Sequence, residues 1–285
     1  MLTFICQPDW VRNLVPEKAV TIDGFRCYAP ALARGGIDYP IEYFDKLYHC
    51  EAQHFWFRAR TRIIVRTLRR YLKHQARPRV LEVGCGTGYV LQSLAAEKRY
   101  ELTGLESHIA GLRYARRRIP DVELVQADAR DLPYESEFDA IGAFDVIEHI
   151  DEDNTVLASI RRALKPGGIV VVTVPQHKWL WSRTDEAAMH KRRYSRRELA
   201  SKFRAADLDT LYCTSFVTML LPAMYASRLV KRQPTASSEH DVYEFELSRV
   251  AGAMCAAGML LDEAVIAAGL SLPVGGSLLA VARKH

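Results

Sequence analysis

The sequence predicts an α/β fold: a doubly wound, mostly parallel sheet of seven strands. From Arg79 onward, short apolar segments alternate with helical ones, and stops such as Lys165-Pro166-Gly167-Gly168 separate them. Short apolar strands that alternate with helices are typical of parallel sheets covered on both faces. The composition, 49% hydrophobic and 26% charged over 285 residues, is that of an ordinary globular protein.

The strands and helices of this sheet can be placed by their apolar patterns. The expected strands are 79–83, 101–105, 122–125, 139–144, 169–174, 211–216 and 277–282. The expected helices are about 51–74, 88–97, 108–118 and 153–164. A capping box at Ser195-Arg196-Arg197-Glu198 starts a further helix that runs to about Ala206.

Two segments flank or interrupt this pattern. Residues 1–50 are rich in proline and are expected to form an irregular arm, with one short hairpin at Asp23-Gly24. Residues 51–285 then form one domain, with a helical insertion at about 220–270 before the last strand. The last helix of the insertion carries apolar residues every three or four positions from Tyr243 to Ala268, and a polar loop is expected at 231–241.

The composition limits the cellular compartments and the kinds of partner that can be expected. The six cysteines form no C-x-x-C pair, and the first ten residues do not resemble a signal peptide. Apolar runs such as 216–226 are too short to span a bilayer. We therefore expect a cytoplasmic protein with reduced thiols. The net charge of +5 does not by itself imply nucleic acid. A peripheral membrane contact and a homodimer stay open.

The first strand ends in a glycine-rich turn, Glu82-Val83-Gly84-Cys85-Gly86-Thr87-Gly88. Glycines at alternate positions let the backbone turn sharply and approach a ligand, which would lie at the carboxyl ends of the strands. A dinucleotide fold would have its third glycine at position 89, where this chain has Tyr89. Glu82 suits a cationic ligand better than a pyrophosphate. The alternative is a tight turn without a ligand.

This turn resembles the E/D-x-G-x-G-x-G signature of class I S-adenosylmethionine-dependent methyltransferases. The resemblance implies that S-adenosyl-L-methionine binds at Glu82, Gly84, Cys85, Gly86 and Gly88, with the acid at the methionine end. The family also has an acid after the second strand, which contacts the ribose hydroxyls. Glu106 has that position here; its alternative is an exposed turn residue.

Two later segments extend the resemblance to residues 79–175. In the segment after the third strand, the family's acid accepts from the adenine amino group. This position is Asp128, and Ala129 packs beside the ring. After the fourth strand, Asp145 faces the cofactor, while Glu148 and His149 lie near the transferring methyl.

The flanks resemble a bacterial type 11/12 subset that is often found beside sugar or lipid biosynthesis genes. The matching pieces are His54–Arg60, 185–199 and 272–278. Many such relatives begin with a zinc ribbon. Here only Cys6 and Cys27 remain, with Asp9 where a second thiolate would stand, so no metal is expected.

Methyl transfer from a sulfonium needs alignment, exclusion of water and, for a hydroxyl, removal of a proton. His149 is the first candidate base, and His190 and Tyr194 in the 176–194 loop are the second. The alternative for His149 is a structural histidine bonded to the sheet. The basic run 190–194 either grips an anionic substrate or forms a solvated face. The loop and the insertion are expected to form the substrate side of the pocket.

The sequence therefore predicts a methyltransferase that acts on oxygen, nitrogen or carbon of a small metabolite, with a glycan or lipid-linked precursor as one option. An RNA methyltransferase is the alternative within the enzymes, suggested by Arg116-Arg117-Arg118 and the arginine-rich first helix. No appended RNA-binding module is visible, so no nucleic-acid partner is expected. A third hypothesis is a catalytically silent, cofactor-binding partner subunit.

Overall fold

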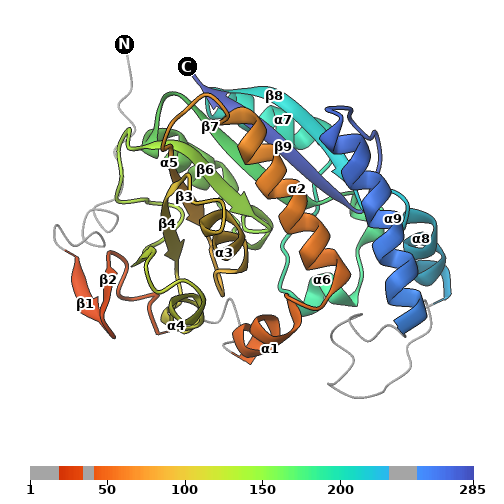
Figure 1. The fold of residues 1–285 in the computed structure, drawn as a ribbon, viewed down its shortest axis with the longest axis horizontal. Coiled ribbons are helices and arrows are strands. Elements are labelled where there is room, and N and C mark those ends of the chain that lie inside the picture. The colour runs from red at the N-terminus through yellow and green to blue at the C-terminus, as the bar shows by residue number, and fades with distance from the viewer. Residues whose placement is uncertain (1–18, 35–41, 231–248) are drawn as a thin grey trace, which may run out of the picture.

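The computed structural model describes residues 19–34, 42–230 and 249–285, and a mixed sheet runs through its centre (Figure 1). Within these residues the sheet has nine strands, in the order β1-β2-β5-β4-β3-β6-β7-β9-β8. They are β1 Val20–Ile22, β2 Phe25–Cys27, β3 Arg79–Val83, β4 Glu101–Glu106, β5 Glu123–Gln126, β6 Phe138–Phe144, β7 Leu164–Pro175, β8 Leu208–Phe216 and β9 Ser277–Lys284.

Strands β2, β5, β4, β3, β6 and β7 are mutually parallel, and β9 lies antiparallel between β7 and β8. The prediction of a doubly wound, mostly parallel sheet is confirmed. All seven expected strands are present; β7 and β8 begin several residues earlier than expected, at Leu164 and Leu208. The strand order reverses at β3, which has β4 on one side and β6 on the other. Ligands of such sheets bind at this switch point, beyond the carboxyl ends.

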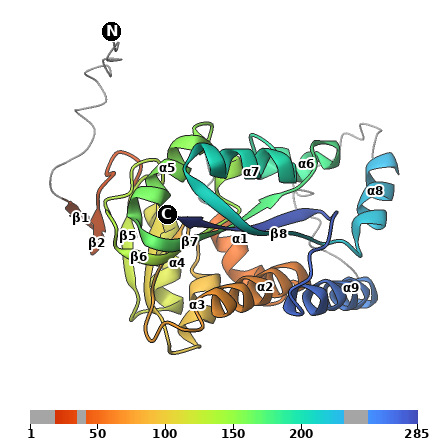
Figure 2. The same cartoon turned by 90° about the horizontal axis from the view of Figure 1, so that it is seen from above.

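Helices cover both faces of the sheet (Figure 2). They are α1 Glu42–Cys50, α2 Phe55–Tyr71, α3 Tyr89–Ala95, α4 Ile109–Arg118, η1 Ile147–His149, α5 Asp153–Ala163, η2 Lys178–Leu180, α6 Arg183–Ala187, α7 Arg196–Ala205, α8 Leu221–Val230 and α9 Arg249–Ala267. Helices α5, α6 and α7 lie on one face, and α2, α3 and α9 on the other (Figure 2). Alternate residues of β7 serve the two cores: Val170 and Val172 pack on one face and Val171 on the other.

The helix expected at about 51–74 is present as α2, Phe55–Tyr71, and it begins four residues later than expected. His54 precedes it: this residue has an extended backbone, and its Nδ1 accepts a hydrogen bond from Trp56 N at 3.3 Å. Such an N-cap starts a new helix. The sequence pattern did not predict α1, since it lies in the stretch expected to be irregular.

The expected hairpin at Asp23-Gly24 is present as β1 and β2. It is also part of the sheet, since β2 pairs in parallel with β5. The pattern of residues 1–50 did not indicate this pairing. Residues 1–18 and 35–41 of that arm lie outside the described residues.

Helix α9 packs against α2. Glu263 of α9 is buried and pairs with Arg62 at 2.6 Å and Arg66 at 3.1 Å. Met259 and Ile266 are buried in the same interface, whereas Met254 and Leu261 are largely exposed. The continuous apolar stripe expected on this helix is therefore only partly used. The polar loop expected at 231–241 lies outside the described residues.

The membrane question concerns helix length and hydropathy. Among the helices of residues 19–34, 42–230 and 249–285, none combines the length and the apolar character needed to cross a bilayer.

Candidate functional site

The glycine turn follows β3 at the switch point of the sheet. Gly84, Gly86 and Gly88 have positive φ angles of 67°, 52° and 78°, and Gly88 is the N-cap of α3. A Cβ on Gly84 would lie 2.5 Å from a methyl group of Val146, whereas a Cβ on Gly86 would meet nothing within 4 Å. Gly84 therefore serves packing, and Gly86 borders open space.

Glu82 is buried at the end of β3, and only 4% of its surface is exposed. Its Oε2 has no hydrogen-bond partner within the described residues. Burial raises the pKa of this carboxyl group to about 8, although Arg60 opposes the shift. A buried carboxyl group with an unused oxygen is costly unless a donor or a cation completes it. The site therefore fits a ligand that brings a positively charged donor.

Glu106 follows β4 and faces the same turn. Its Oε2 accepts from Gly86 N at 3.0 Å, and its Oε1 accepts from Ser107 Oγ at 3.0 Å and His108 N at 3.1 Å. The residue is buried, so the alternative of an exposed turn glutamate is wrong. A carboxylate has about four acceptor positions, so one remains for a ligand hydroxyl and another opens if Ser107 turns away.

Asp145, after β6, has a positive φ of 56°. A non-glycine residue rarely adopts this conformation, and such strain is frequent at functional sites. Its Oδ2 accepts from Thr173 Oγ1 at 3.2 Å and lies 2.6 Å from Arg60 Nε. Arg60 also donates to Phe144 O at 3.0 Å and stacks over Trp56 at 5.1 Å.

Arg60 was missed as a site residue. Its signal was an arginine within the His54–Arg60 segment of α2, on the side that turns out to face the sheet. Arg60 is buried, its Nε lies 2.6 Å from Asp145 Oδ2, and its charge lowers the pKa of Glu82 against the larger, opposite effect of burial.

A second missed group connects α1 to the glycine turn. Thr87 donates to Glu51, which follows α1 and pairs with Arg118 of α4 at 2.6 Å. The Arg118 guanidinium lies over the Tyr48 ring at 4.4 Å and donates to Tyr48 O. These contacts join residues that are far apart in the sequence, so no local sequence pattern predicts them.

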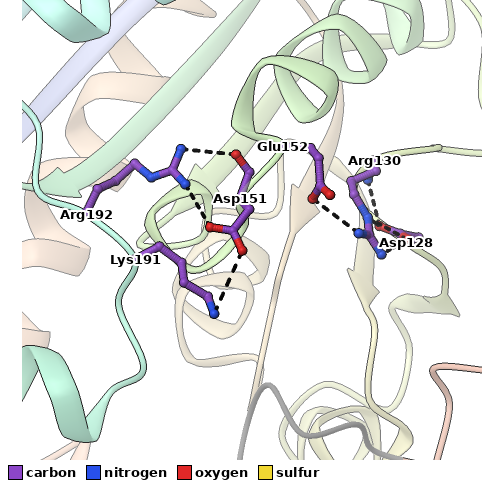
Figure 3. Close-up of polar contacts among 6 residues, drawn as sticks. All are labelled: Asp128, Arg130, Asp151, Glu152, Lys191 and Arg192. Atoms are coloured by element: carbon purple, nitrogen blue, oxygen red, sulfur yellow. Dashed lines mark hydrogen bonds and ion pairs between the residues drawn. The ribbon is translucent and has the colours of Figure 1, made fainter.

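Asp128 follows β5 and is engaged within the chain. Both of its oxygens accept from the Arg130 guanidinium, with a shortest distance of 2.7 Å, and Arg130 reaches Glu152 at 3.3 Å (Figure 3). Ala129 beside it is buried. An adenine amino group would therefore share Asp128 with Arg130.

Glu148, His149 and His190 meet at the end of β6. One potential ligand atom from each lies within 4.8 Å of the others. Glu148 is fully buried, and neither of its oxygens has a hydrogen-bond partner within the described residues. Burial, helped by Asp145, raises the pKa of Glu148 well above its usual range. Burial next to His190 lowers the pKa of His149 to about 3, which makes His149 a weak base.

His190 is held by Asp185 of α6. Its Nδ1 lies 2.9 Å from Asp185 Oδ1. Asp185 is buried and also accepts two bonds from Arg193, at 2.7 and 2.9 Å. Burial alone would raise the pKa of Asp185, but these hydrogen bonds from His190 and Arg193 lower it to about 2. Asp185 therefore stays ionised and fixes the orientation of the His190 ring.

Tyr194 does not fit the role of a base. Its hydroxyl donates within the core to Asp153 Oδ2 at 2.7 Å, with Ile147 O at 3.2 Å, and only 1% of the residue is exposed. Burial and the bond to Asp153 raise its pKa. Tyr194 is therefore a packing residue, which corrects its assignment as a catalytic candidate.

The basic run 190–194 is mostly committed to partners in the chain. Lys191 and Arg192 turn toward Asp151, at 3.9 and 3.2 Å (Figure 3). Arg193 is buried against Asp185. These contacts support structural roles for the run over a grip on an anionic substrate.

The loop between β7 and α7 contacts the insertion through α8. Trp179 of η2 and Tyr225 of α8 meet edge to face at 5.8 Å, and both are about half exposed. Two further exposed residues are Trp181, which follows Trp179 by two positions, and Met219, which precedes Tyr225 by six. Helix α8 therefore supplies the contact expected between the loop and the insertion, whereas α9 packs on α2.

Comparison with known proteins identifies a family model and relatives that this chain resembles. A family model described as a methyltransferase domain matches residues 81–172. The chain is 32% identical over 167 residues to phthiotriol/phenolphthiotriol dimycocerosates methyltransferase 1 of Mycobacterium ulcerans (strain Agy99), with 54% of this chain and 60% of that protein covered. It is 38% identical over 99 residues to a fatty-acid O-methyltransferase of Mycolicibacterium smegmatis, with 33% and 36% covered.

The matches thus span 60% and 36% of the length of these two curated relatives. A solved structure titled as the [4+2]-cyclase SpnF has the same fold, with a TM-score of 0.52, 24% identity and 78% and 80% of the two chains covered. A protein with this fold is thus named for a cyclisation, so the fold alone does not determine the reaction. The glycine turn and the strand order agree with the family match, and residues 81–172 of the chain form a methyltransferase domain.

Proposed function

We propose that the protein transfers a methyl group from S-adenosyl-L-methionine to a hydroxyl oxygen of a small, partly apolar molecule such as a lipid or lipid-linked precursor. The proposal is carried by Glu82, whose buried Oε2 has no hydrogen-bond partner among the described residues. Glu82 lies at the carboxyl end of β3, four residues before Gly86, where a Cβ would meet no atom within 4 Å. An acceptor without a partner and open space in the same turn suit the cationic methionine end of the cofactor.

The other cofactor contacts follow from the strand ends. Glu106 would accept from the ribose hydroxyls while it holds the Gly86 amide. Ala129 would pack beside the adenine, with Asp128 shared between the adenine amino group and Arg130. Asp145, fixed by Arg60 and Thr173, would face the methyl-bearing end. The sulfonium supplies an activated methyl group, so these residues have only to bind and orient it.

The acceptor side supports an apolar substrate. Trp179, Trp181, Met219 and Tyr225 expose aromatic and aliphatic surface on the loop and next to it. Two relatives are named for apolar substrates, a phthiotriol-type lipid and a fatty acid. An apolar wall with few polar groups is what a small-molecule pocket requires.

His190 is the stronger candidate for proton removal. Asp185 holds its Nδ1, which leaves Nε2 to accept the hydroxyl proton. The oxygen would form its bond to the methyl carbon as the carbon–sulfur bond of the sulfonium breaks and S-adenosylhomocysteine leaves. Burial and the neighbouring His190 lower the pKa of His149, which makes His149 a poor proton acceptor.

The arginines that suggested RNA are engaged within the chain. Arg118 is buried with Glu51, Arg116 lies over Phe25 at 4.8 Å, and Arg62 pairs with Glu263. Arg118 and Arg62, which are paired with carboxylates, offer little charge to phosphates, whereas Arg116 has only a ring contact. This observation favours the small-molecule hypothesis over the RNA one.

The test has two stages. Calorimetric titration with S-adenosylmethionine should show one site per chain, and methyl-labelled cofactor should then transfer label to hydroxylated lipids in preference to RNA. Failure to bind the cofactor would overturn the proposal. Binding without transfer to any acceptor would support the silent-subunit hypothesis instead.

A further inference from the structure

We infer that Glu148, His149 and His190 form a binding site for a divalent transition-metal ion at the acceptor edge of the pocket. This inference deepens the proposed function and rests on it only for the role of the ion. No metal ligand was expected from the sequence. Glu148 and His149 lie about forty positions from His190, and the three residues show no ligand spacing of the usual kind.

The geometry brings three ligand atoms together. One atom from each side chain lies within 4.8 Å of the other two. Ligands bound about 2.0–2.2 Å from an ion lie at most about 4.4 Å apart, so small side-chain adjustments would close the site. The carboxylate comes from η1 and one imidazole from the residue next to it, while the second imidazole comes from the loop before α7.

Glu148 is the second, independent observation. Its carboxyl group is fully buried, and within the described part of the chain neither oxygen has a hydrogen-bond partner. Buried polar groups nearly always have partners, and an orphaned carboxyl group calls for an ion or a ligand. One of its carboxylate oxygens lies within 4.8 Å of a nitrogen atom of each histidine.

His190 has the arrangement found at protein metal sites. Its Nδ1 is bound to Asp185 Oδ1 at 2.9 Å, so Nε2 is the atom left to bind an ion. A carboxylate behind a metal-binding histidine fixes the ring and raises its basicity. Asp185 is itself fixed by Arg193 and by Ser182 N at 2.8 Å.

Nearby cations do not oppose an ion here, because they are neutralised by partners. Arg193 forms two bonds with Asp185, and Lys191 and Arg192 turn toward Asp151 (Figure 3). Two imidazoles and one carboxylate favour zinc, manganese, iron or cobalt over magnesium or calcium, which prefer oxygen ligands.

Three protein ligands leave positions open for a substrate oxygen. The chemical class that this site would take is therefore an acceptor with a hydroxyl group, which the ion would bind and make more acidic. With the ion present, Nε2 of His190 would be a ligand, and the hydroxyl proton would leave to water. The oxygen would form its bond to the methyl carbon as the carbon–sulfur bond of the sulfonium breaks and S-adenosylhomocysteine leaves. In the metal-bound protein this replaces the role of base given to His190 above.

The experiment titrates the purified full chain with Co²⁺, followed by its visible absorption, and with Mn²⁺, followed by electron paramagnetic resonance. Mg²⁺ is the comparison ion. We expect one saturable site per chain for Co²⁺ and Mn²⁺. Glu148→Gln and His190→Ala should each weaken it at least tenfold, and Asp185→Asn about tenfold. His49→Ala is the matched control, since this histidine is exposed on α1, and it should leave the affinity unchanged.

Thermal unfolding with and without Co²⁺ separates lost binding from lost folding. Glu148→Gln keeps the shape of the side chain, so it decides the question if His190→Ala does not fold. Absence of saturable binding, or equal binding by Glu148→Gln, overturns the inference. S-adenosylmethionine is titrated into the same preparations without metal: cofactor binding without a metal site sinks this inference alone, and a metal site without cofactor binding sinks the proposed function alone.

Discussion

The two sides of the site are built in different ways. On the proposed cofactor side, backbone conformation and single carboxyl groups at strand ends make the arrangement, as at Gly86, Glu82 and Glu106. On the proposed acceptor side, buried side chains hold one another in a network, as with Asp185, His190 and Arg193. A substitution on the proposed cofactor side should therefore remove one contact and leave the other contacts in place. The second side should respond as a unit, because removing one partner leaves another charge buried.

Gly86→Val should have the largest effect on the cofactor side. A branched side chain would fill the space beyond Gly86, and we expect S-adenosylmethionine affinity to fall at least about 100-fold, or about 2.7 kcal/mol. Calorimetry measures it. Gly167→Val is the matched control, since Gly167 also has a positive φ and open space but lies in the turn near the start of β7. Equal losses in both variants would mean that backbone strain, and not the ligand space, causes the effect.

Asp185→Asn should have the largest effect on the acceptor side. Arg193 would stay buried without a counter-charge, so the free energy of unfolding should fall by about 3 kcal/mol. Urea denaturation measures this change. Cofactor affinity should stay within about twofold, since Asp185 and the glycine turn share no contact and distant sites are usually independent. A parallel loss of cofactor affinity would contradict the division into two sides.

Glu82→Gln should stabilise the cofactor-free protein. The folded state keeps the Glu82 proton up to about pH 8, while the unfolded chain loses it above its ordinary value of 4.5. The free energy of unfolding therefore falls as the pH rises from 4.5 to 8, and the variant should recover about 1–3 kcal/mol at pH 7.

Cofactor affinity should fall in the same variant, because the carboxylate is lost. Denaturation at pH 5 and pH 7 checks the sign: the variant's gain should be larger at pH 7. A gain that does not depend on pH would mean that Glu82 is ionised in the folded protein.

Arg130→Ala should have the smallest effect. The Arg130–Asp128 pair is partly exposed, so its loss should cost less than about 1 kcal/mol of stability. Because Arg130 occupies both oxygens of Asp128, its removal should leave cofactor affinity equal or slightly higher. Arg162→Ala, which breaks the neighbouring exposed pair with Asp131, is the control. A clear loss of affinity specific to Arg130→Ala would show that Arg130 itself contacts the cofactor.

The same division decides what the sequence could predict. The strands from β3 to β7, the Ser195 capping box and the positive φ angles of the glycine turn follow from local patterns, and the structure has them. The apolar pattern did not reveal the N-cap at His54, which sets the start of α2. The pairing of β2 with β5 joins residues about a hundred positions apart. The pairs Arg60–Asp145 and Glu263–Arg62 are also distant in sequence, so no periodicity revealed them.

Candidate residues divided in the same way. Tyr194 looked catalytic because it stands in a loop after a strand, but its ring fills the core and its hydroxyl serves Asp153. Composition cannot distinguish a buried tyrosine from an exposed one. The resemblance placed Glu148 near the transferring methyl, but no pattern predicted that its carboxyl group is buried without a hydrogen-bond partner among the described residues.

The position of β9 has a consequence for how the protein is synthesised. Within the described residues β8 pairs only with β9, which follows it after the whole insertion and also borders β7. While a ribosome extends the chain, β8 has no strand to join until residues 277–284 emerge. That edge of the sheet is therefore completed late, by contacts between distant residues that form slowly. During that interval the unpaired edges of β7 and β8 are exposed to other chains, and a chaperone that covers them would raise the yield.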